Sequence, residues 1–272
     1  MNAPTVTAGT LRVPDALLYY EVRGSGPLVV LVAAPMDARS FAPLAELLAT
    51  DHTVLTTDPR GINRSTVDDP DADATVDRRA DDLARLITHL DAGPAAVLGS
   101  SGGAVSALAL AQSRPELVHT VVAHEPPLHE VLDDRERLHE LTEDIIATYS
   151  SGDVVGAWRK FLAVANIHLP EEVFQQMFAG ERDAQQIAAD DYQHAHMLRP
   201  TVRWRPDLSA LRWGPTRIVV GIGTESAGQL CDRSSRALAA ALGIEPAMFP
   251  GDHIGFVGDP ENFVTRLRDV LA

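Results

Sequence analysis

The sequence predicts an α/β protein in which a mostly parallel central sheet is flanked by helices and carries a helical cap insertion. Three observations support this fold class. Strand-like and helix-like segments alternate over residues 1–127, residues 128–211 are helix-like, and the alternation then resumes. Alternation on both sides of a helical segment is typical of a parallel sheet covered by helices.

The strands of the first part are short apolar runs that end at turn residues. Residues 28–34 are apolar throughout, which is typical of a strand buried on both faces. Residues 78–90 instead place their leucine and isoleucine side chains on one face, as in an amphipathic helix. The other strands expected here are residues 10–13, 17–23, 53–57, 95–98 and 117–123, and the other helices are residues 41–49 and 104–113.

The second part of the chain divides into an insertion and the end of the core. Residues 128–211 are richer in charge and predict a helical cap, so that the core comprises residues 1–127 and 212–272. After the cap, we expect two further strands and two further helices. The strands are residues 217–220 and 247–249, and the helices are residues 234–242 and 260–271.

Composition limits the partners and the location. The 272 residues carry 23 basic and 38 acidic side chains, a formal charge of −15, which disfavours nucleic acid because that partner requires a basic surface. No apolar run approaches the ~20 residues of a membrane span, so no membrane association is expected. The first ten residues lack the pattern of a secretory signal, and the single cysteine, Cys231, excludes an intrachain disulfide. We therefore expect a cytoplasmic protein.

The sharpest motif is Gly99-Ser100-Ser101-Gly102-Gly103, which fits Gly-x-Ser-x-Gly with Ser101 at its centre. It follows an expected strand and opens an expected helix, which is the setting that a nucleophile elbow requires. So tight a turn accepts only small residues two positions before and after the serine. The N-terminus of the following helix favours developing negative charge. Ser101 is therefore the predicted catalytic nucleophile.

A serine hydroxyl needs a general base, and His253 is the predicted one. It follows the last expected strand and precedes the last expected helix. The loop at that place lies at the carboxyl edge of the sheet, beside the elbow. His194 and His196 lie in the insertion, where their spacing alone is a weak metal signal, and no His-Glu-x-x-His motif is present. No metal site is predicted.

Two glutamates compete for the third place of the triad, which holds the imidazole in the correct tautomer. Glu225 follows the expected strand that ends at residue 220, and Glu125 follows the one that ends at residue 123. Both respect the chain order serine, acid, histidine. We prefer Glu225, because its strand is nearer in sequence to His253. Glu125 stays the alternative, because Pro126 and Pro127 stiffen its loop.

Three stretches together resemble the α/β-hydrolase superfamily over nearly the whole chain. They are residues 99–103, the Pro-Gly-Asp-His of residues 250–253, and the Asp-Pro-Arg-Gly-Ile-Asn-Arg-Ser of residues 58–65. The last is similar to the superfamily's Asp-x-Arg-Gly-x-Gly-x-Ser loop, with Asn63 in place of the second glycine. The closest resemblance is to small bacterial esterases and lactonases. A serine nucleophile excludes relatives that need an aspartate, such as haloalkane dehalogenases.

One departure from the superfamily pattern concerns the oxyanion hole. Members usually carry His-Gly after the third strand, followed by the residue whose amide donates. Residues 32–37, Val-Ala-Ala-Pro-Met-Asp, occupy that place and resemble His-Gly-x-Pro-Leu-Asp. The resemblance thus implies a hole made by the amides of Ala34 and Gly102. A shift of one residue would put Pro35 at the donor position, and losing one donor typically costs ~10²–10³ in rate.

These residues predict a serine hydrolase that cleaves a small-molecule carboxylic ester or lactone through an acyl-enzyme intermediate. An apolar pocket under the cap suits such a substrate. No Gly-x-Gly-x-x-Gly or P-loop is present, so no cofactor is expected. The alternatives are a tailoring enzyme that uses the triad for cyclisation, transesterification or C–C cleavage, and a catalytically weak binding homologue. Candidate pocket walls are Trp158, Phe161, Leu162, Phe174, Met177, Phe178, Tyr192 and Met197.

Overall fold

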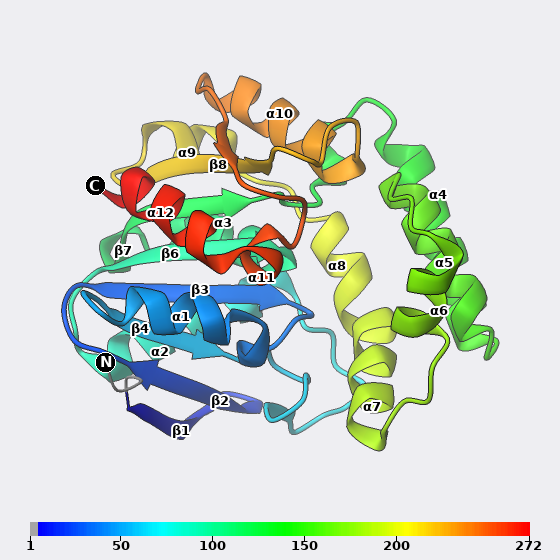
Figure 1. The fold of residues 1–272 in the computed structure, drawn as a ribbon, viewed down its shortest axis with the longest axis horizontal. Coiled ribbons are helices and arrows are strands. Elements are labelled where there is room, and N and C mark those ends of the chain that lie inside the picture. Colours follow the sequence, from blue (N-terminus) through cyan, green and yellow to red (C-terminus); the bar gives the residue numbers. More distant parts are fainter. Residues whose placement is uncertain (1–4) are drawn as a thin grey trace.

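The computed structural model describes residues 5–272, in which nine strands form one sheet (Figure 1). The strand order is β1-β2-β4-β3-β6-β7-β8-β9, and β5 pairs with β2 at the side. Strand β2 is antiparallel to both β1 and β4, whereas every pair from β4 to β9 is parallel. The strands are β1 (Val6–Val13), β2 (Ala16–Arg23), β3 (Leu28–Ala34), β4 (Thr53–Thr57), β5 (Thr66–Val67), β6 (Ala95–Ser101), β7 (Val118–His124), β8 (Arg217–Gly223) and β9 (Ala247–Phe249).

Helices cover both faces of the sheet, so the predicted α/β fold class is confirmed. Strand β3 shows why its run is apolar at every position. Val30 and Val32 pack with Leu83 on one face, while Val29 and Leu31 join a separate cluster on the other. The helices that flank the sheet are α1 (Ala42–Leu48), α2 (Val76–Leu90), α3 (Gly102–Ser113), α9 (Leu208–Trp213), α10 (Leu230–Leu242), α11 (Gly255–Gly258) and α12 (Pro260–Leu271).

The chain between β7 and α9 forms a group of helices beyond the carboxyl ends of the parallel strands, at the right of Figure 1. Helix α9 itself packs on α3 and α10, next to the sheet. The π-helical segment η4 (Gln193–Met197) continues α7, and such segments are frequent at functional sites. The helices of this group are α4 (Arg135–Ser150), α5 (Val154–Ala165), α6 (Glu171–Phe178), α7 (Ala184–Tyr192) and α8 (Leu198–Val202).

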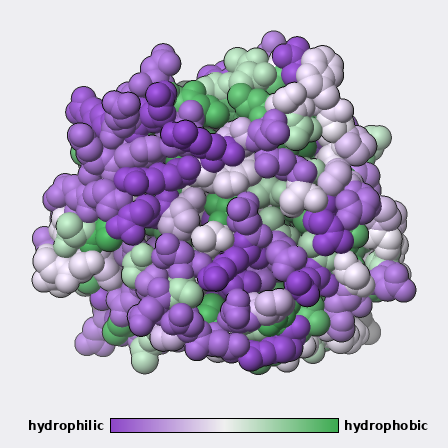
Figure 2. All heavy atoms as spheres, turned by 180° about the vertical axis from the view of Figure 1, so that it is seen from behind, coloured by the Kyte–Doolittle hydropathy of each residue, from purple (hydrophilic) through white to green (hydrophobic). Residues whose placement is uncertain are grey.

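The surface of the molecule is mainly hydrophilic on the face seen in Figure 2. Figure 2 shows the face opposite to that of Figure 1, where hydrophilic residues dominate and hydrophobic residues form small scattered groups. Within residues 5–272, no helix is both long and apolar enough to cross a membrane.

Candidate active site

Ser101 lies at the sharp turn between β6 and α3. Strand β6 runs to Ser101, three residues further than the sequence predicts, because its parallel pairing with β3 continues until Ala34 faces Ser101. Ser101 has φ 53° and ψ −126°, a conformation that a residue with a side chain rarely adopts. Such strain clusters at functional sites, where the surrounding structure holds it. The geometry is that of a nucleophile elbow.

The glycines of the motif are required by close backbone contacts. A Cβ atom on Gly103 would lie 2.3 Å from the Val32 carbonyl oxygen, and one on Gly99 would lie 2.5 Å from the Gly103 carbonyl oxygen. A Cβ atom on Gly102 would lie 2.7 Å from the carbonyl oxygen of Ala34. The elbow therefore packs directly against the end of β3, and the lack of side chains on these glycines permits this contact.

His253 lies in the loop after β9, and its ring contacts a buried carboxylate. Its Nδ1 is 2.6 Å from Oε2 of Glu125, whose side chain is fully buried while that of His253 is 23% exposed. The other oxygen of Glu125, Oε1, accepts a hydrogen bond of 2.8 Å from the amide of Gly223 at the end of β8. Glu125 is thus held between two neighbouring strand ends, and it fixes the orientation of the imidazole.

The preferred pairing of His253 with Glu225 is therefore wrong, and the alternative, Glu125, makes the contact. Glu225 lies two residues beyond the end of β8, where its amide donates to the carbonyl of Gly251 at 2.9 Å. This turn leaves the Glu225 side chain exposed. Glu125 directly follows β7 with a φ of 51°, which directs its side chain into the interior.

The electrostatics of this pair favour a carboxylate beside an imidazole that can carry charge. Burial raises the pKa of Glu125, but the hydrogen bond and the charge of His253 lower it by more. The pKa of Glu125 is therefore about 2. Burial lowers the pKa of His253, but the neighbouring Cys231 and Glu125 raise it by more. The pKa of His253 therefore lies well above its usual value. Glu125 is therefore ionised and stabilises the protonated form of His253.

Ala34 and Gly102 lie at the same rim as Ser101. Ala34 is the last residue of β3 and Gly102 the first of α3, and both line the pocket that contains Ser101 and His253. The predicted oxyanion residues are thus brought together with the predicted nucleophile. Pro35 follows Ala34 at the pocket wall.

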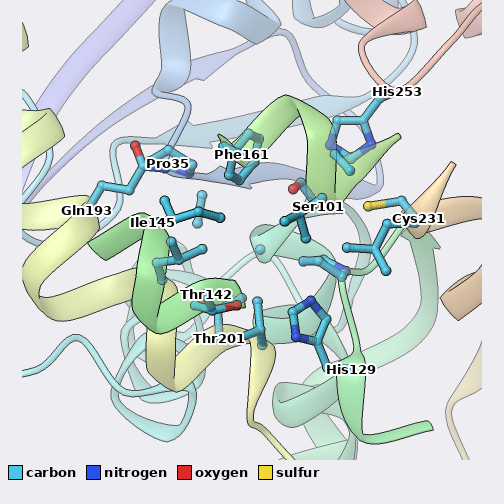
Figure 3. Close-up of a pocket in the computed structure, with 18 of the residues that line it drawn as sticks. Pro35, Ser101, His129, Thr142, Ile145, Phe161, Gln193, Thr201, Cys231 and His253 are labelled. Atoms are coloured by element: carbon cyan, nitrogen blue, oxygen red, sulfur yellow. The ribbon is translucent and has the colours of Figure 1, made fainter. Parts of the chain in front are cut away.

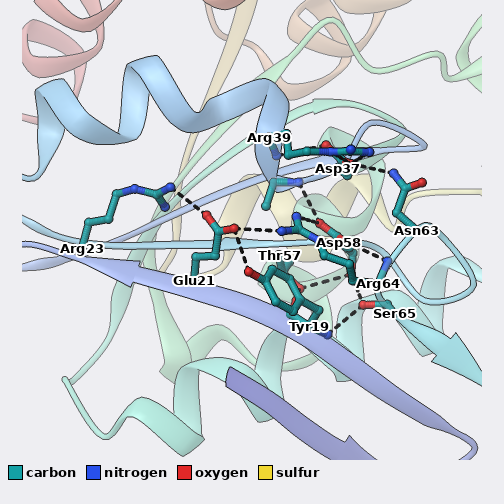
Figure 4. Close-up of polar contacts among 11 residues, drawn as sticks. Tyr19, Glu21, Arg23, Asp37, Arg39, Thr57, Asp58, Asn63, Arg64 and Ser65 are labelled. Carbon is teal, nitrogen blue, oxygen red and sulfur yellow. Dashed lines mark hydrogen bonds and ion pairs between the residues drawn. The ribbon is translucent and has the colours of Figure 1, made fainter. Parts of the chain in front are cut away.

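The loop that follows Ala34 is held by a network of charged side chains (Figure 4). Oδ1 of Asp58 accepts a hydrogen bond from the Ala38 amide at 3.0 Å, and Oδ2 accepts from Nε of Arg64 at 2.7 Å. Asn63 donates to Oδ2 of Asp37 at 2.6 Å. Asn63 has φ 50°, which asparagine tolerates in place of glycine. Residues 58–65 therefore tie the loop after β3 to the end of β4.

A mostly apolar pocket lies beneath the helices of the insertion, with Ser101, His253 and Cys231 at one end (Figure 3). His129, Thr142 and Thr201 gather at the other end. His129 is buried, and its Nδ1 has no hydrogen-bond partner among the described residues. Burial lowers the pKa of His129 to about 4, so its imidazole is neutral at neutral pH. One end of the pocket thus carries Ser101 and His253, and the other end carries neutral polar side chains.

Of the eight candidate pocket walls, Phe161 and Met197 line this pocket. Phe174 is buried, and its ring centroid is 5.4 Å from that of Phe178. Tyr192 is buried and donates to the carbonyl of Ala72 at 3.0 Å. Trp158, Met177 and Phe178 line a separate hollow near Arg39. Leu162 is not among the residues that line the pocket.

Other wall residues were not predicted, although some carried a signal. Thr142 and Ile145 lie three residues apart on α4, so both reach the pocket from the same helix face. Cys231 is the second residue of the helix that follows β8, at the carboxyl edge of the sheet. Gln193, at the start of η4, has no comparable signal in the sequence.

Comparisons with known proteins agree with the fold. The family described as alpha/beta hydrolase fold matches residues 26–153. An uncharacterized hydrolase of Bacillus subtilis is 32% identical over 282 aligned positions, which cover 98% of this chain and 97% of the relative. A zearalenone hydrolase of Bionectria ochroleuca is 26% identical, with 94% of this chain and 95% of the relative covered.

Solved structures show the same architecture. A hydrolase from Pseudomonas aeruginosa superposes with a TM-score of 0.72 at 20% identity, covering 97% of this chain and 98% of the other. An enol-lactonase from Burkholderia xenovorans gives 0.71 at 17% identity, with 97% and 99% covered. A thermophilic esterase from Thermogutta terrifontis gives 0.68 at 21% identity, with 99% and 98% covered. By its elbow, its sheet order and its full-length similarity to a bacterial hydrolase, the chain belongs to the α/β-hydrolase superfamily.

Proposed function

We propose that the protein is a serine hydrolase that cleaves a carboxylic ester or lactone with Ser101, His253 and Glu125. The observation that carries this proposal is the 2.6 Å contact between His253 and the buried Glu125, at the rim of the pocket that contains Ser101. A strained serine, an oriented imidazole and a buried carboxylate are the three parts of a serine hydrolase triad.

The proposed reaction follows from these groups. His253 takes the proton of the Ser101 hydroxyl as the serine oxygen bonds to the substrate carbonyl carbon. The amides of Ala34 and Gly102 stabilise the oxyanion that forms. Collapse of this intermediate expels the alkoxide, which receives the proton from His253, and the acyl group stays on Ser101. Water, deprotonated by His253, then releases the acid and restores the serine.

The pocket supports a particular kind of substrate. Its walls are mostly apolar, so they suit the body of a medium-sized ester or lactone. The neutral His129, at the end away from Ser101, can hydrogen-bond to a hydroxyl or carbonyl group of that substrate. The helices α4–α8 would act as a lid that excludes water from the reaction. The relatives named as hydrolases agree with this class of reaction.

A fluorophosphonate probe and a substrate panel test the proposal. Wild-type protein should be labelled at Ser101 and should hydrolyse some p-nitrophenyl esters or lactones of the panel. Ser101→Ala should lose both labelling and turnover and keep the circular dichroism spectrum. Ser100→Ala is the matched control at the neighbouring buried serine, and it should stay labelled.

The outcomes separate the proposal from its alternatives. Equal turnover by Ser101→Ala would exclude Ser101 as the nucleophile. Labelling of Ser101 without release of free acid from any substrate would favour transfer to an acceptor other than water. Tight ligand binding without labelling would favour a binding protein.

A further inference from the structure

We propose that Cys231 and His253 form a binding site for a soft divalent metal ion such as Zn²⁺. The observation behind this proposal is a cluster of three side chains that come from separate loops and helices. A sulfur atom of Cys231, a ring nitrogen of His253 and a carboxylate oxygen of Glu125 all lie within 4.8 Å of one another. Figure 3 shows the Cys231 sulfur pointing into the pocket beside the His253 ring.

The two ring nitrogens of His253 have different surroundings. Nδ1 faces Oε2 of Glu125 at 2.6 Å, so this nitrogen carries a proton that it donates to the carboxylate. In the neutral imidazole, Nε2 is then the nitrogen with a free lone pair. In zinc sites, a ligating histidine almost always donates its other N–H to a carboxylate or carbonyl, which fixes the ring and raises its basicity. The Glu125–His253 pair already has this arrangement.

The donor atoms determine which metal ions fit. A thiolate and an imidazole are preferred ligands of Zn²⁺ and related soft ions, whereas Mg²⁺ and Ca²⁺ prefer oxygen ligands. With Zn–S of about 2.3 Å and Zn–N of about 2.0–2.1 Å, the two donors of a tetrahedral ion lie about 3.5 Å apart. The sulfur and the ring nitrogen of the present cluster lie within 4.8 Å of each other, which is close to that separation.

The position of Cys231 makes this binding accessible and specific. Cys231 is the only cysteine of the chain, it is half-buried, and it lines the pocket with Ser101 and His253. When the ion binds, the thiol proton of Cys231 and the Nε2 proton of any protonated His253 pass to solvent. Water would complete the coordination, because the pocket side of the ion is open.

Metal binding has a consequence that rests on the proposed function. An ion on Nε2 occupies the lone pair with which His253 accepts the proton of Ser101. Zn²⁺ would therefore inhibit hydrolysis, and removal of the ion would restore it. The binding itself depends on Cys231 and His253, so it can be tested separately from turnover.

Binding is measured with Cd²⁺ on the Ser101→Ala variant, which keeps both ligands and lacks the proposed nucleophile. We expect a near-ultraviolet thiolate-to-cadmium absorbance band that saturates at one ion per chain. Cys231→Ser removes the soft donor at nearly constant volume and should abolish the band. Glu125→Gln should weaken binding ~10–100-fold, as loss of such a supporting group typically does. An undiminished band in Cys231→Ser, or no band in Ser101→Ala, would overturn the proposal.

Inhibition is measured on the wild type with a p-nitrophenyl ester. Zn²⁺ should lower the rate, excess EDTA should restore it, and equal Mg²⁺ should leave it unchanged. In Cys231→Ser, the ratio of rates with and without Zn²⁺ should stay near one. His52→Gln, at a histidine that pairs with Asp51 away from the pocket, should retain the wild-type Zn²⁺ response. Equal inhibition of wild type and Cys231→Ser would contradict the site.

The cadmium experiment tests the metal site, and the ester experiment tests the proposed function. A cadmium band without any ester turnover would leave the metal site standing and contradict the proposed function. Ester turnover without a cadmium band would support the proposed function and contradict the metal site.

Discussion

Two residues of the site, Ser101 and Glu125, have positive φ angles of 53° and 51° although neither is glycine. Such conformations cost of order 1–3 kcal/mol each and persist only where the surrounding structure holds them. At Ser101 the strain turns the hydroxyl toward the pocket, and at Glu125 it turns the carboxylate toward His253. The two strained residues thus belong to the same proposed triad.

The roles of the two glutamates can be separated by mutation. Glu125→Gln should lower kcat by ~10²–10⁴-fold, because an amide does not stabilise the imidazolium and can hold the wrong tautomer. Glu225→Gln is the matched control, since its side chain is exposed, and it should stay within about twofold of wild type. Steady-state kinetics of both variants with one ester decide the matter. A large loss in Glu225→Gln with a normal Glu125→Gln would contradict the assignment.

At the scale of elements, the site depends on how closely α3 approaches the end of β3. Gly102 and Gly103 stand against the backbone of Val32, Ala33 and Ala34, with no room for a methyl group. The same contact brings Ala34 and Gly102 to one rim of the pocket. Packing of the two elements and the proposed oxyanion hole therefore have a common cause.

This contact predicts the effect of a single methyl group. Gly103→Ala would place Cβ 2.3 Å from a backbone oxygen, so β3 or α3 must shift. We expect a loss of about 1–3 kcal/mol or more in the free energy of unfolding, and a lower rate. Gly258→Ala is the control, because nothing lies within 4 Å of its added Cβ. Thermal denaturation of both variants measures the difference, and equal melting temperatures would refute the steric explanation.

The oxyanion hole is tested by a phosphonate adduct on Ser101. We expect one phosphonyl oxygen within hydrogen-bond distance of the amides of both Ala34 and Gly102, because donors must be aimed at the position of the developing charge. A high-resolution crystal structure of the adduct measures these distances. An oxygen that contacts Gly102 alone would show that Ala34 is not a donor.

At the scale of the whole molecule, ion pairs connect β2 to the loop beside the site. Glu21 on β2 accepts hydrogen bonds from Arg23 at 2.7 Å and from Arg64 at 3.0 Å. Arg64 in turn contacts Asp58, which binds the amide of Ala38. These ion pairs therefore stabilise the fold and also hold the loop after β3 in its position (Figure 4).

This link predicts a dependence of stability on pH. Burial raises the pKa of Glu21, but hydrogen bonds from Arg23 and Tyr19 lower it more, and the net shift is downward from 4.5. Its stabilisation is then fully present above about pH 4.5 and is lost as the pH falls toward the lowered pKa of the folded state. Glu21→Gln should be less stable at pH 7 by about 1–3 kcal/mol.

The measurement is the midpoint of urea unfolding between pH 7 and pH 3. The midpoint of Glu21→Gln should decline less steeply with acid than that of wild type. Glu245→Gln, at an exposed glutamate, serves as the control and should follow the wild-type curve. If the midpoint of Glu21→Gln fell with acid as steeply as that of the wild type, Glu21 would not contribute to the acid sensitivity.

The sequence by itself determined the fold class, the elbow and the loop that carries His253. These features depend on local patterns: an apolar run such as residues 28–34 reports burial on both faces, and a turn as tight as residues 99–103 requires glycine wherever it occurs. The carboxyl ends of parallel strands share one edge, so the order of strands and loops along the chain is enough to predict that Ser101 and His253 lie near each other.

The tertiary structure decided what local patterns do not contain, namely the directions of side chains and the contacts between distant segments. Glu125 and Glu225 both follow strands at the same edge, and only the positive φ of Glu125 and the exposed turn at Glu225 separate them. Trp158, Phe174 and Phe178 of the insertion pack on one another, because a group of helices outside the sheet must bury apolar side chains of its own. Cys231 reaches His253 only because α10 starts beside the end of β8, and that proximity depends on the order of strands in the folded sheet.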